Sequence, residues 1–307
     1  MTTETRPKRR WQILVFLAPA VLVYTALMIL PLFGTLKLAL YENVNEQQVF
    51  VGFKNFATLF GDPNWSEAFW RGLKNNFWFF FIHMAVQNPI GIALAAMLSV
   101  PALRFKAFYR TAIFIPTILS FVIVGFAWKL ILSPLWGIAP GLLDAVGLKH
   151  LFKPWLGLED YALTTIALIS VWQYVGIPMM LIYAALLSIP DEVLEAGEID
   201  GITGMKAFWK IKLPLILPSI GIISILTFVG NFNAFDLVYT IEGAMAAPNF
   251  STEVMGTLMF RTFFGHQTQP GDPNMGSAIA MMMFLIILAG VTVYLFLIQT
   301  RMRRYQF

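Results

Sequence analysis

The chain has 307 residues, of which 58% are apolar, 15% aromatic and only 12% charged. Charged residues make up about a quarter of a typical water-soluble domain, and disordered chains are poor in apolar residues, so the composition excludes both classes. The absence of cysteine excludes disulfides, thiol nucleophiles and thiolate metal sites. Three widely separated histidines argue against a histidine metal cluster. These numbers predict an all-α membrane protein.

Six stretches are long and apolar enough to cross a bilayer, which requires about 20 mainly apolar residues per helix. They are residues about 12–36, 76–99, 111–132, 161–187, 215–235 and 276–299. The first contains Ala18-Pro19-Ala20, which is similar to a signal-peptide cleavage site, but cleavage there would leave too short an apolar core. We therefore expect a retained first span and a single transmembrane domain over residues 1–307.

The basic residues predict the orientation, because Lys and Arg gather in cytoplasmic loops. Thirteen of the 21 basic residues lie at the termini and in two loops: Arg6, Lys8, Arg9, Arg10, Arg104, Lys106, Arg110, Lys206, Lys210, Lys212, Arg301, Arg303 and Arg304. Both termini should therefore be cytoplasmic. The basic character then reflects this bias toward the cytoplasmic side and not a nucleic-acid surface, so membrane lipid is expected as a partner and nucleic acid is not.

The remaining loops, about 41–75, 133–160 and 236–275, should face the opposite side. They contain turn sequences such as Gly61-Asp62-Pro63-Asn64, and tryptophans such as Trp65 and Trp136 that suit a membrane interface. An independent soluble domain needs about 50 residues or more, so none is expected. The sequence leaves open whether the two halves of the chain are related by a pseudo-twofold axis.

The predicted spans lack the groups that would support coupled transport or catalysis within this chain. No Asp or Glu lies near a span centre, and His83 alone is ionisable there, most simply as a neutral group bonded to a neighbouring helix. Serine-hydrolase, zinc-protease and phosphate-loop motifs are absent from the sequence. The chain is therefore not expected to be an enzyme, to bind a metal or a cofactor, or to hydrolyse ATP itself.

The predicted cytoplasmic loop 188–214 is the most patterned polar segment. It should form a helix from Asp191 to the Asp200-Gly201 break, then a second helix with Thr203 as N-cap that ends at Leu213-Pro214. Such a pair of helices could bind a soluble partner or lie on lipid headgroups. The residues alone leave these alternatives open.

At this point the sequence resembles a known family, on motifs spread over nearly the whole chain. The loop motif consists of Glu195-Ala196-Gly197, Asp200-Gly201, Phe208, Ile211, Leu213-Pro214 and Pro218. Further motifs are Leu17-Ala-Pro-Ala, Leu30-Pro31-Leu32, Val51-Gly52-Phe53-Lys-Asn55-Phe56, Ile189-Pro190, Phe235-Asp236-Leu-Val-Tyr239 and Ser251-Thr-Glu253. Together they resemble the permease subunits of bacterial ABC importers for carbohydrates, of the maltose and glycerol-phosphate type, with Gly197 and Ile202 departing from the usual pattern.

The resemblance implies a type I ABC importer permease of the bacterial cytoplasmic (inner) membrane. It implies four kinds of partner: a second homologous permease, two ATPase subunits that bind ATP and Mg, an extracytoplasmic solute-binding protein, and membrane lipid. The loop would couple the spans to an ATPase through Glu195, Ala196, Asp200, Gly201 and Phe208. ATP-driven closure of the ATPases would then switch the access of the pathway.

Polar residues on two spans are candidates for the solute pathway. Ser170, Gln173, Tyr174 and Ile177 share one helical face, and Thr227, Gly230, Asn231 and Ala234 share another, with Asn233 adjacent. The resemblance implies that these two faces line a sugar pocket, and the alternative is hydrogen bonding between helices. Gln87-Asn88-Pro89 is interpreted as a kink.

The resulting hypothesis is a permease subunit that forms the pathway for a carbohydrate or related small polar solute. A stand-alone secondary carrier or channel is the alternative, which the loop motif and the carboxylate-free spans disfavour. Sugars, polyols and phosphorylated or sulfonated sugars all remain open, as does the subunit that supplies most of the contacts.

Overall fold

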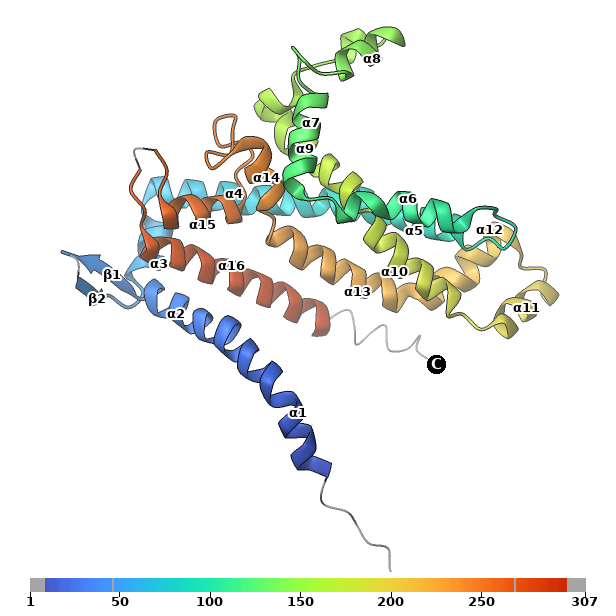
Figure 1. The fold of residues 1–307 in the computed structure, drawn as a ribbon, viewed down its shortest axis with the longest axis horizontal. Coiled ribbons are helices and arrows are strands. Elements are labelled where there is room, and N and C mark those ends of the chain that lie inside the picture. Colours follow the sequence, from blue (N-terminus) through green and yellow to red (C-terminus); the bar gives the residue numbers. More distant parts are fainter. Residues whose placement is uncertain (1–8, 46, 268, 297–307) are drawn as a thin grey trace, which may run out of the picture.

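The computed structural model describes residues 9–45, 47–267 and 269–296 (Figure 1). Helices dominate it, and one antiparallel hairpin pairs β1 (Tyr41–Val44) with β2 (Gln47–Phe50). The helices are α1 (Arg9–Tyr24), α2 (Leu30–Ala39), α3 (Lys54–Gly61), α4 (Pro63–Ile82), α5 (Asn88–Leu98), α6 (Lys106–Ile118), α7 (Phe121–Ile131), α8 (Ala139–Ala145), α9 (Glu159–Tyr174), α10 (Gly176–Leu187), α11 (Asp191–Ile199), α12 (Gly204–Ala207), α13 (Leu213–Phe232), α14 (Asp236–Glu242), α15 (Met255–Phe264) and α16 (Pro273–Tyr294).

Four segments of the described chain are continuous helices that could cross a membrane. They are Trp11–Ala39, Pro63–Leu98, Gly204–Phe232 and Pro273–Tyr294. Two further candidates are broken: α6 and α7 meet at 96°, and α9 and α10 meet at 42°. Counting each bent pair as one span gives the six predicted spans. The terminal basic residues Arg6, Lys8, Arg301, Arg303 and Arg304, and the end of the last predicted span, lie outside the described residues.

Three of the long helices continue through a proline because a wider turn precedes it. The π-helical turns Thr25–Ile29, His83–Gln87 and Phe208–Lys212 are followed two residues after their ends by Pro31, Pro89 and Pro214. A proline inside a helix removes one backbone hydrogen bond, and its ring clashes with the carbonyl of the preceding turn. A π-helical turn shifts that carbonyl and so relieves the collision.

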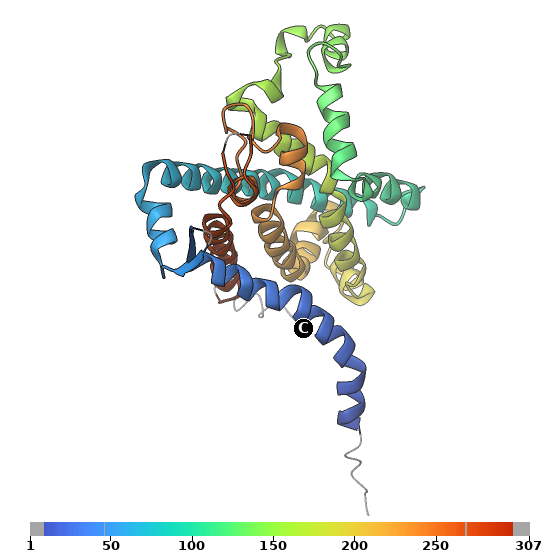
Figure 2. The ribbon, with the colours of Figure 1, turned by 60° about the vertical axis from the view of Figure 1, so that its left-hand side comes forward.

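The bend between α6 and α7 has local causes. Leu119 adopts an extended conformation after Pro116, and the Ser120 hydroxyl accepts a hydrogen bond from the Val122 amide at 3.3 Å, which caps α7. Figures 1 and 2 show α7 and α8 projecting from the side of the bundle. The predicted straight span 111–132 is therefore two helices, and α7 is directed across α6.

The bend between α9 and α10 packs directly against α6. A side-chain carbon at Gly176 would lie 3.0 Å from the Ile113 carbonyl oxygen, so a larger residue would push the helices apart. The Thr117 hydroxyl donates to the Gln173 carbonyl at 3.0 Å, and the Gln173 amide donates to the Leu119 carbonyl at 3.1 Å. These bonds join the two bends.

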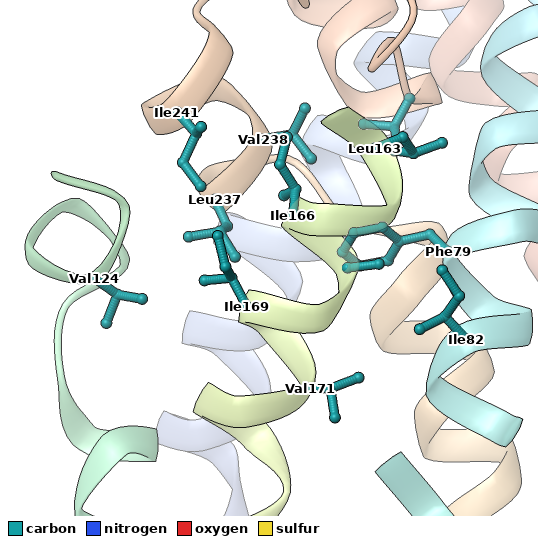
Figure 3. Packing of buried hydrophobic residues seen from close by; sticks show 12 residues of the cluster. Phe79, Ile82, Val124, Leu163, Ile166, Ile169, Val171, Leu237, Val238 and Ile241 are labelled. Atoms are coloured by element: carbon teal, nitrogen blue, oxygen red, sulfur yellow. The ribbon is translucent and has the colours of Figure 1, made fainter. Parts of the chain in front are cut away.

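The central apolar cluster is built around α9. Figure 3 shows Phe79 of α4, Ile166 and Ile169 of α9, and Leu237 and Ile241 of α14, meeting across one shared core. Gly125 lets α7 approach α14, since a side-chain carbon there would lie 2.7 Å from the Thr240 methyl group. The short helix α14 is thereby held between α7 and α9, next to the end of α13.

Candidate functional site

A cavity of about 450 Å³ opens between α4, the following π-helical turn, α9, α10, α13 and the start of α14. Five of the six predicted pathway residues line it: Ser170, Tyr174, Thr227, Asn231 and Asn233. The two helical faces identified in the sequence therefore meet at one hollow. Gln173 does not line it, because this fully buried side chain bonds to Leu119 at the α6–α7 bend.

The hydrogen bonds of His83 fix its neutral tautomer. Nδ1 lies 2.8 Å from the Phe79 carbonyl oxygen, which can only accept, so Nδ1 carries the proton. Nε2 then accepts a hydrogen bond from the Ser170 hydroxyl at 3.0 Å. This bond uses the one proton that Ser170 can donate, and the serine oxygen keeps only acceptor capacity toward the cavity.

Thr227, Asn231 and Asn233 each donate one hydrogen bond to a carbonyl of α13, and the two amides keep a second N–H donor. The Thr227 hydroxyl donates to the Ile223 carbonyl at 2.8 Å, the Asn231 amide donates to the Thr227 carbonyl at 2.6 Å, and the Asn233 amide donates to the Val229 carbonyl at 2.9 Å. Thr227 also bonds between helices, since the Asn88 amide donates to its hydroxyl at 3.3 Å, and all three residues line the cavity. The amide groups of Asn231 and Asn233 therefore offer an acceptor oxygen and one remaining N–H donor each.

Three polar lining residues, His83, Gln87 and Asp236, were not among the predicted pathway residues. Gln87, interpreted as part of a kink, is 6% exposed and its Oε1 has no hydrogen-bond partner within the described chain. Asp236 contributes a carboxylate at the start of α14. Phe79, His83 and Gln87 follow one another at steps of four, and all three line the cavity. This spacing would have revealed that α4 and the π-helical turn after it form a third wall.

The predicted coupling loop begins with helix α11, which ends in a regular Schellman cap. The Ile202 amide donates to the Gly197 carbonyl at 2.8 Å, and the Gly201 amide donates to the Glu198 carbonyl at 3.0 Å. Gly201 has φ +70°, the left-handed conformation that this cap requires. The Asp-Gly break is therefore a tight turn of fixed geometry.

The candidate coupling residues occupy the outer surface of this turn. Glu195, Ala196, Asp200 and Gly201 are exposed, and Phe208 is half-buried. Within the described residues, the five acidic side chains between Asp191 and Asp200 form no salt bridge. Their charges are thus free to meet a basic partner surface.

The family departure Gly197 has a structural reason. A side-chain carbon at this position would lie 2.4 Å from the Ile211 side chain, so glycine allows α11 to pack on the next helix.

The second helix of the loop differs from the prediction. It does not end at Leu213-Pro214 but continues as one helix from Gly204 to Phe232, and the side chain of Thr203 makes no capping hydrogen bond. The π-helical turn before Pro214 explains the continuity. A single helix thus joins the predicted coupling loop to Thr227 and Asn231 in the cavity.

A second polar cluster lies in the loop between α14 and α15. The fully buried Glu253 carboxylate forms ion pairs with Arg71 of α4, at 2.8 Å, and with Arg261 of α15. Both guanidiniums also lie over the Phe250 ring, and the Asn75 amide donates to the carbonyls of Ser251 and Glu253. The cluster fastens this loop to α4.

The sequence is similar to permeases of ABC transporters. It is 31% identical to the probable ABC transporter permease protein YurN of Bacillus subtilis, covering 89% of this chain and 91% of that one. It is 28% identical to the lactose transport system permease protein LacF of Rhizobium radiobacter, over 94% of each chain. Identity to the trehalose/maltose transport system permease protein MalF of Thermococcus litoralis is 26%, over 90% of each.

The fold is that of a solved importer. A chain in the crystal structure of a bacterial ABC transporter involved in import of the acidic polysaccharide alginate superposes with a TM-score of 0.77 and 23% identity, over 97% of this chain and 96% of that one. Residues 87–304 match the family described as binding-protein-dependent transport system inner membrane component. The chain therefore belongs to this family, the permease subunits of ABC importers, in which the ATPase resides on separate subunits.

Proposed function

We propose that this chain forms one wall of an import pathway for an uncharged carbohydrate. It would assemble with a second homologous permease, two ATPase subunits that bind ATP and Mg, and an extracytoplasmic solute-binding protein. The relatives named for lactose and for trehalose and maltose support a carbohydrate. The orientation with both termini in the cytoplasm remains part of the proposal.

The charge of the cavity wall is the observation that carries the solute class. Its free polar atoms include the Gln87, Asn231 and Asn233 amide oxygens and the Asp236 carboxylate, and no Lys or Arg lines it within the described chain. Sugar hydroxyls can donate to such acceptors, whereas phosphate and sulfate groups carry several acceptor oxygens and negative charge. The wall therefore favours a neutral polyol surface over the phosphorylated or sulfonated sugars.

The predicted cytoplasmic coupling loop 188–214 connects ATP hydrolysis to transport in this proposal. Its exposed acidic turn would dock on an ATPase, and the unbroken helix Gly204–Phe232 would carry the displacement to the cavity. A helix of 29 residues is about 44 Å long. Closure of the ATPases would then move Thr227 and Asn231 together with the loop.

The solute class can be tested on the tagged complex purified from its own host and reconstituted in liposomes with the binding protein. We expect ATP-dependent uptake of labelled trehalose, maltose or lactose, and no uptake of trehalose 6-phosphate. Preference for the phosphorylated sugar would contradict the solute class. Purification without an ATPase would contradict the transport mechanism.

The coupling contact can be tested in the same preparation. Glu195→Lys and Gly201→Asp should each reduce ATPase retention and uptake at least tenfold. Asp144→Lys, a charge change of the same kind on an exposed residue in the predicted opposite loop, should leave both unchanged. Retained assembly and normal hydrolysis in the two loop variants would refute the contact.

A further inference from the structure

An unbroken row of aromatic rings connects the cavity to the predicted extracytoplasmic end of α15. Phe235, which lines the cavity, lies 5.0 Å from Tyr239 and 5.1 Å from Phe260 between ring centroids. Phe260 lies 4.9 Å from Phe264, the last residue of α15. We call Phe235, Tyr239, Phe260 and Phe264 the aromatic row.

The sequence builds this row on one face of α15. Gly256, Phe260 and Phe264 recur at steps of four, which places them above one another on a helix. At Gly256 a side-chain carbon would lie 2.7 Å from the Ala234 carbonyl oxygen and 3.0 Å from the Phe235 side chain. Glycine thus allows the turn between α13 and α14 to reach α15, and this approach brings Phe235 into contact with Phe260.

The row is not sealed into the core of this chain. Phe264 is 66% exposed and Tyr239 is 37% exposed, while Phe235 and Phe260 are half-buried. Aromatic residues in a core are normally covered on both faces. The row meets the cavity at Phe235, which lines it, and Tyr239 follows one helical turn after Phe235.

We propose that the aromatic row is a transit site that takes the pyranose rings of a carbohydrate from the extracytoplasmic side to the cavity. The C–H faces of a pyranose are apolar and pack flat against aromatic rings, and the Tyr239 hydroxyl and the Asp236 carboxylate can bond its hydroxyls. Rings about 5 Å apart offer successive contacts, so a sugar can pass from one to the next without being released into water. This inference rests on the proposed carbohydrate solute.

Truncation of the row tests the proposal in the reconstituted complex, with labelled maltose, trehalose and lactose as probes. Phe264→Ala and Tyr239→Ala should each lower the maximal uptake rate about threefold to tenfold, the factor that corresponds to one lost aromatic contact. Phe264→Trp keeps a ring and should retain wild-type uptake, and Tyr239→Phe, which keeps the ring and loses only the hydroxyl, should lose less uptake than Tyr239→Ala. Phe53→Ala removes a 77% exposed ring outside the row and serves as the matched control.

ATP hydrolysis distinguishes transit from docking. A transit site acts after the binding protein has opened, so hydrolysis stimulated by the sugar-loaded binding protein should stay within about twofold of wild type in both alanine variants. A parallel loss of stimulation would assign the rings to binding-protein docking, and loss of the second permease on purification would assign them to subunit packing. Either result overturns the proposal, as does unchanged uptake.

A photoreactive benzophenone side chain at position 264 gives a direct readout. Illumination should attach labelled sugar to this chain, and the same group at position 53 should attach none. If the wild-type complex takes up none of the probes, the proposed function itself fails, whereas uptake by wild type without labelling at position 264 contradicts the transit site alone.

Discussion

The carboxylate of Glu253 is fully buried between the guanidiniums of Arg71 and Arg261. Removing one partner from a buried ion pair leaves uncompensated charge, which costs about 3–5 kcal/mol, whereas an exposed pair contributes at most about 1 kcal/mol. Arg71 takes part in a pair of each kind, because it also forms an ion pair with Glu67, whose side chain is 78% exposed.

We therefore expect Glu253→Gln to lower the free energy of unfolding by about 3 kcal/mol or more. Glu67→Gln should change it by less than about 1 kcal/mol. Chemical unfolding of the detergent-solubilised protein measures both. Equal effects would show that the cluster does not hold the loop to α4.

Glu242 at the end of α14 should make the free energy of unfolding depend on pH. Burial raises the pKa of its carboxyl from 4.5 to about 7, against the opposing charge of Lys129. Between these values the folded protein keeps a proton that the unfolded chain has lost. The free energy of unfolding should therefore fall as the pH rises from about 4.5 to about 7, and then level off.

Glu242→Gln should abolish this part of the pH dependence, because the amide does not ionise. Thermal unfolding between pH 5 and pH 8 should show the variant gaining stability relative to wild type as the pH rises. Glu159→Gln, an exposed change at the start of α9, should follow the wild-type profile. A parallel profile for Glu242→Gln would contradict the raised pKa.

At the scale of elements, the bend between α9 and α10 depends on close contact at one glycine. Gly176 faces the α6 backbone at 3.0 Å, while Gly230 of α13 has no atom within 4 Å of the corresponding position. Alanine in an open helical position stabilises by about 0.5–1 kcal/mol relative to glycine, and overpacking a closed position costs about 1–3 kcal/mol.

Gly176→Ala and Gly230→Ala should consequently shift the unfolding temperature in opposite directions, downward for Gly176 and upward for Gly230. Scanning calorimetry of the two variants in one detergent makes the comparison. If the unfolding temperature rises in both variants, α6 can move away from position 176 without loss of stability.

The elements also show what periodicity and length reveal. Apolar length was sufficient to locate the long helices, because a bilayer imposes that length on every span. It could not reveal the 96° turn between α6 and α7, which depends on the extended backbone of Leu119 and the cap at Ser120. Pro214 predicted a helix end for a sound local reason, but the π-helical turn before it removes the collision.

At the scale of the whole molecule, the predicted cavity depended on pairing helices distant in sequence. Ser170 and Asn231 could be selected as polar residues on apolar helices, whereas Gln173 was indistinguishable from them until its contact with Leu119 was known. Gln87 was hidden for the opposite reason, since the proline that follows it at position 89 suggested a purely structural role. Contacts between separate spans settle such cases, and local sequence does not encode them.

The absence of cysteine allows a direct test of orientation. Glu198→Cys in the predicted cytoplasmic loop should react with a membrane-impermeant maleimide only after the membrane is permeabilised. Asp144→Cys, in the exposed loop beyond α7, should react in intact spheroplasts. The reverse accessibility would invert the predicted topology.

The first and last described spans are packed against each other. The Asn274 amide at the start of α16 donates to the Leu38 carbonyl at 3.0 Å, and Ala39 shares a buried cluster with Met275 and Ile279. Ribosomes synthesise a chain from its N-terminus, so α2 enters the bilayer long before α16 exists. The face of α2 that packs on α16 therefore has no partner when α2 is inserted. The contact between the two helices forms only after α16 has been inserted.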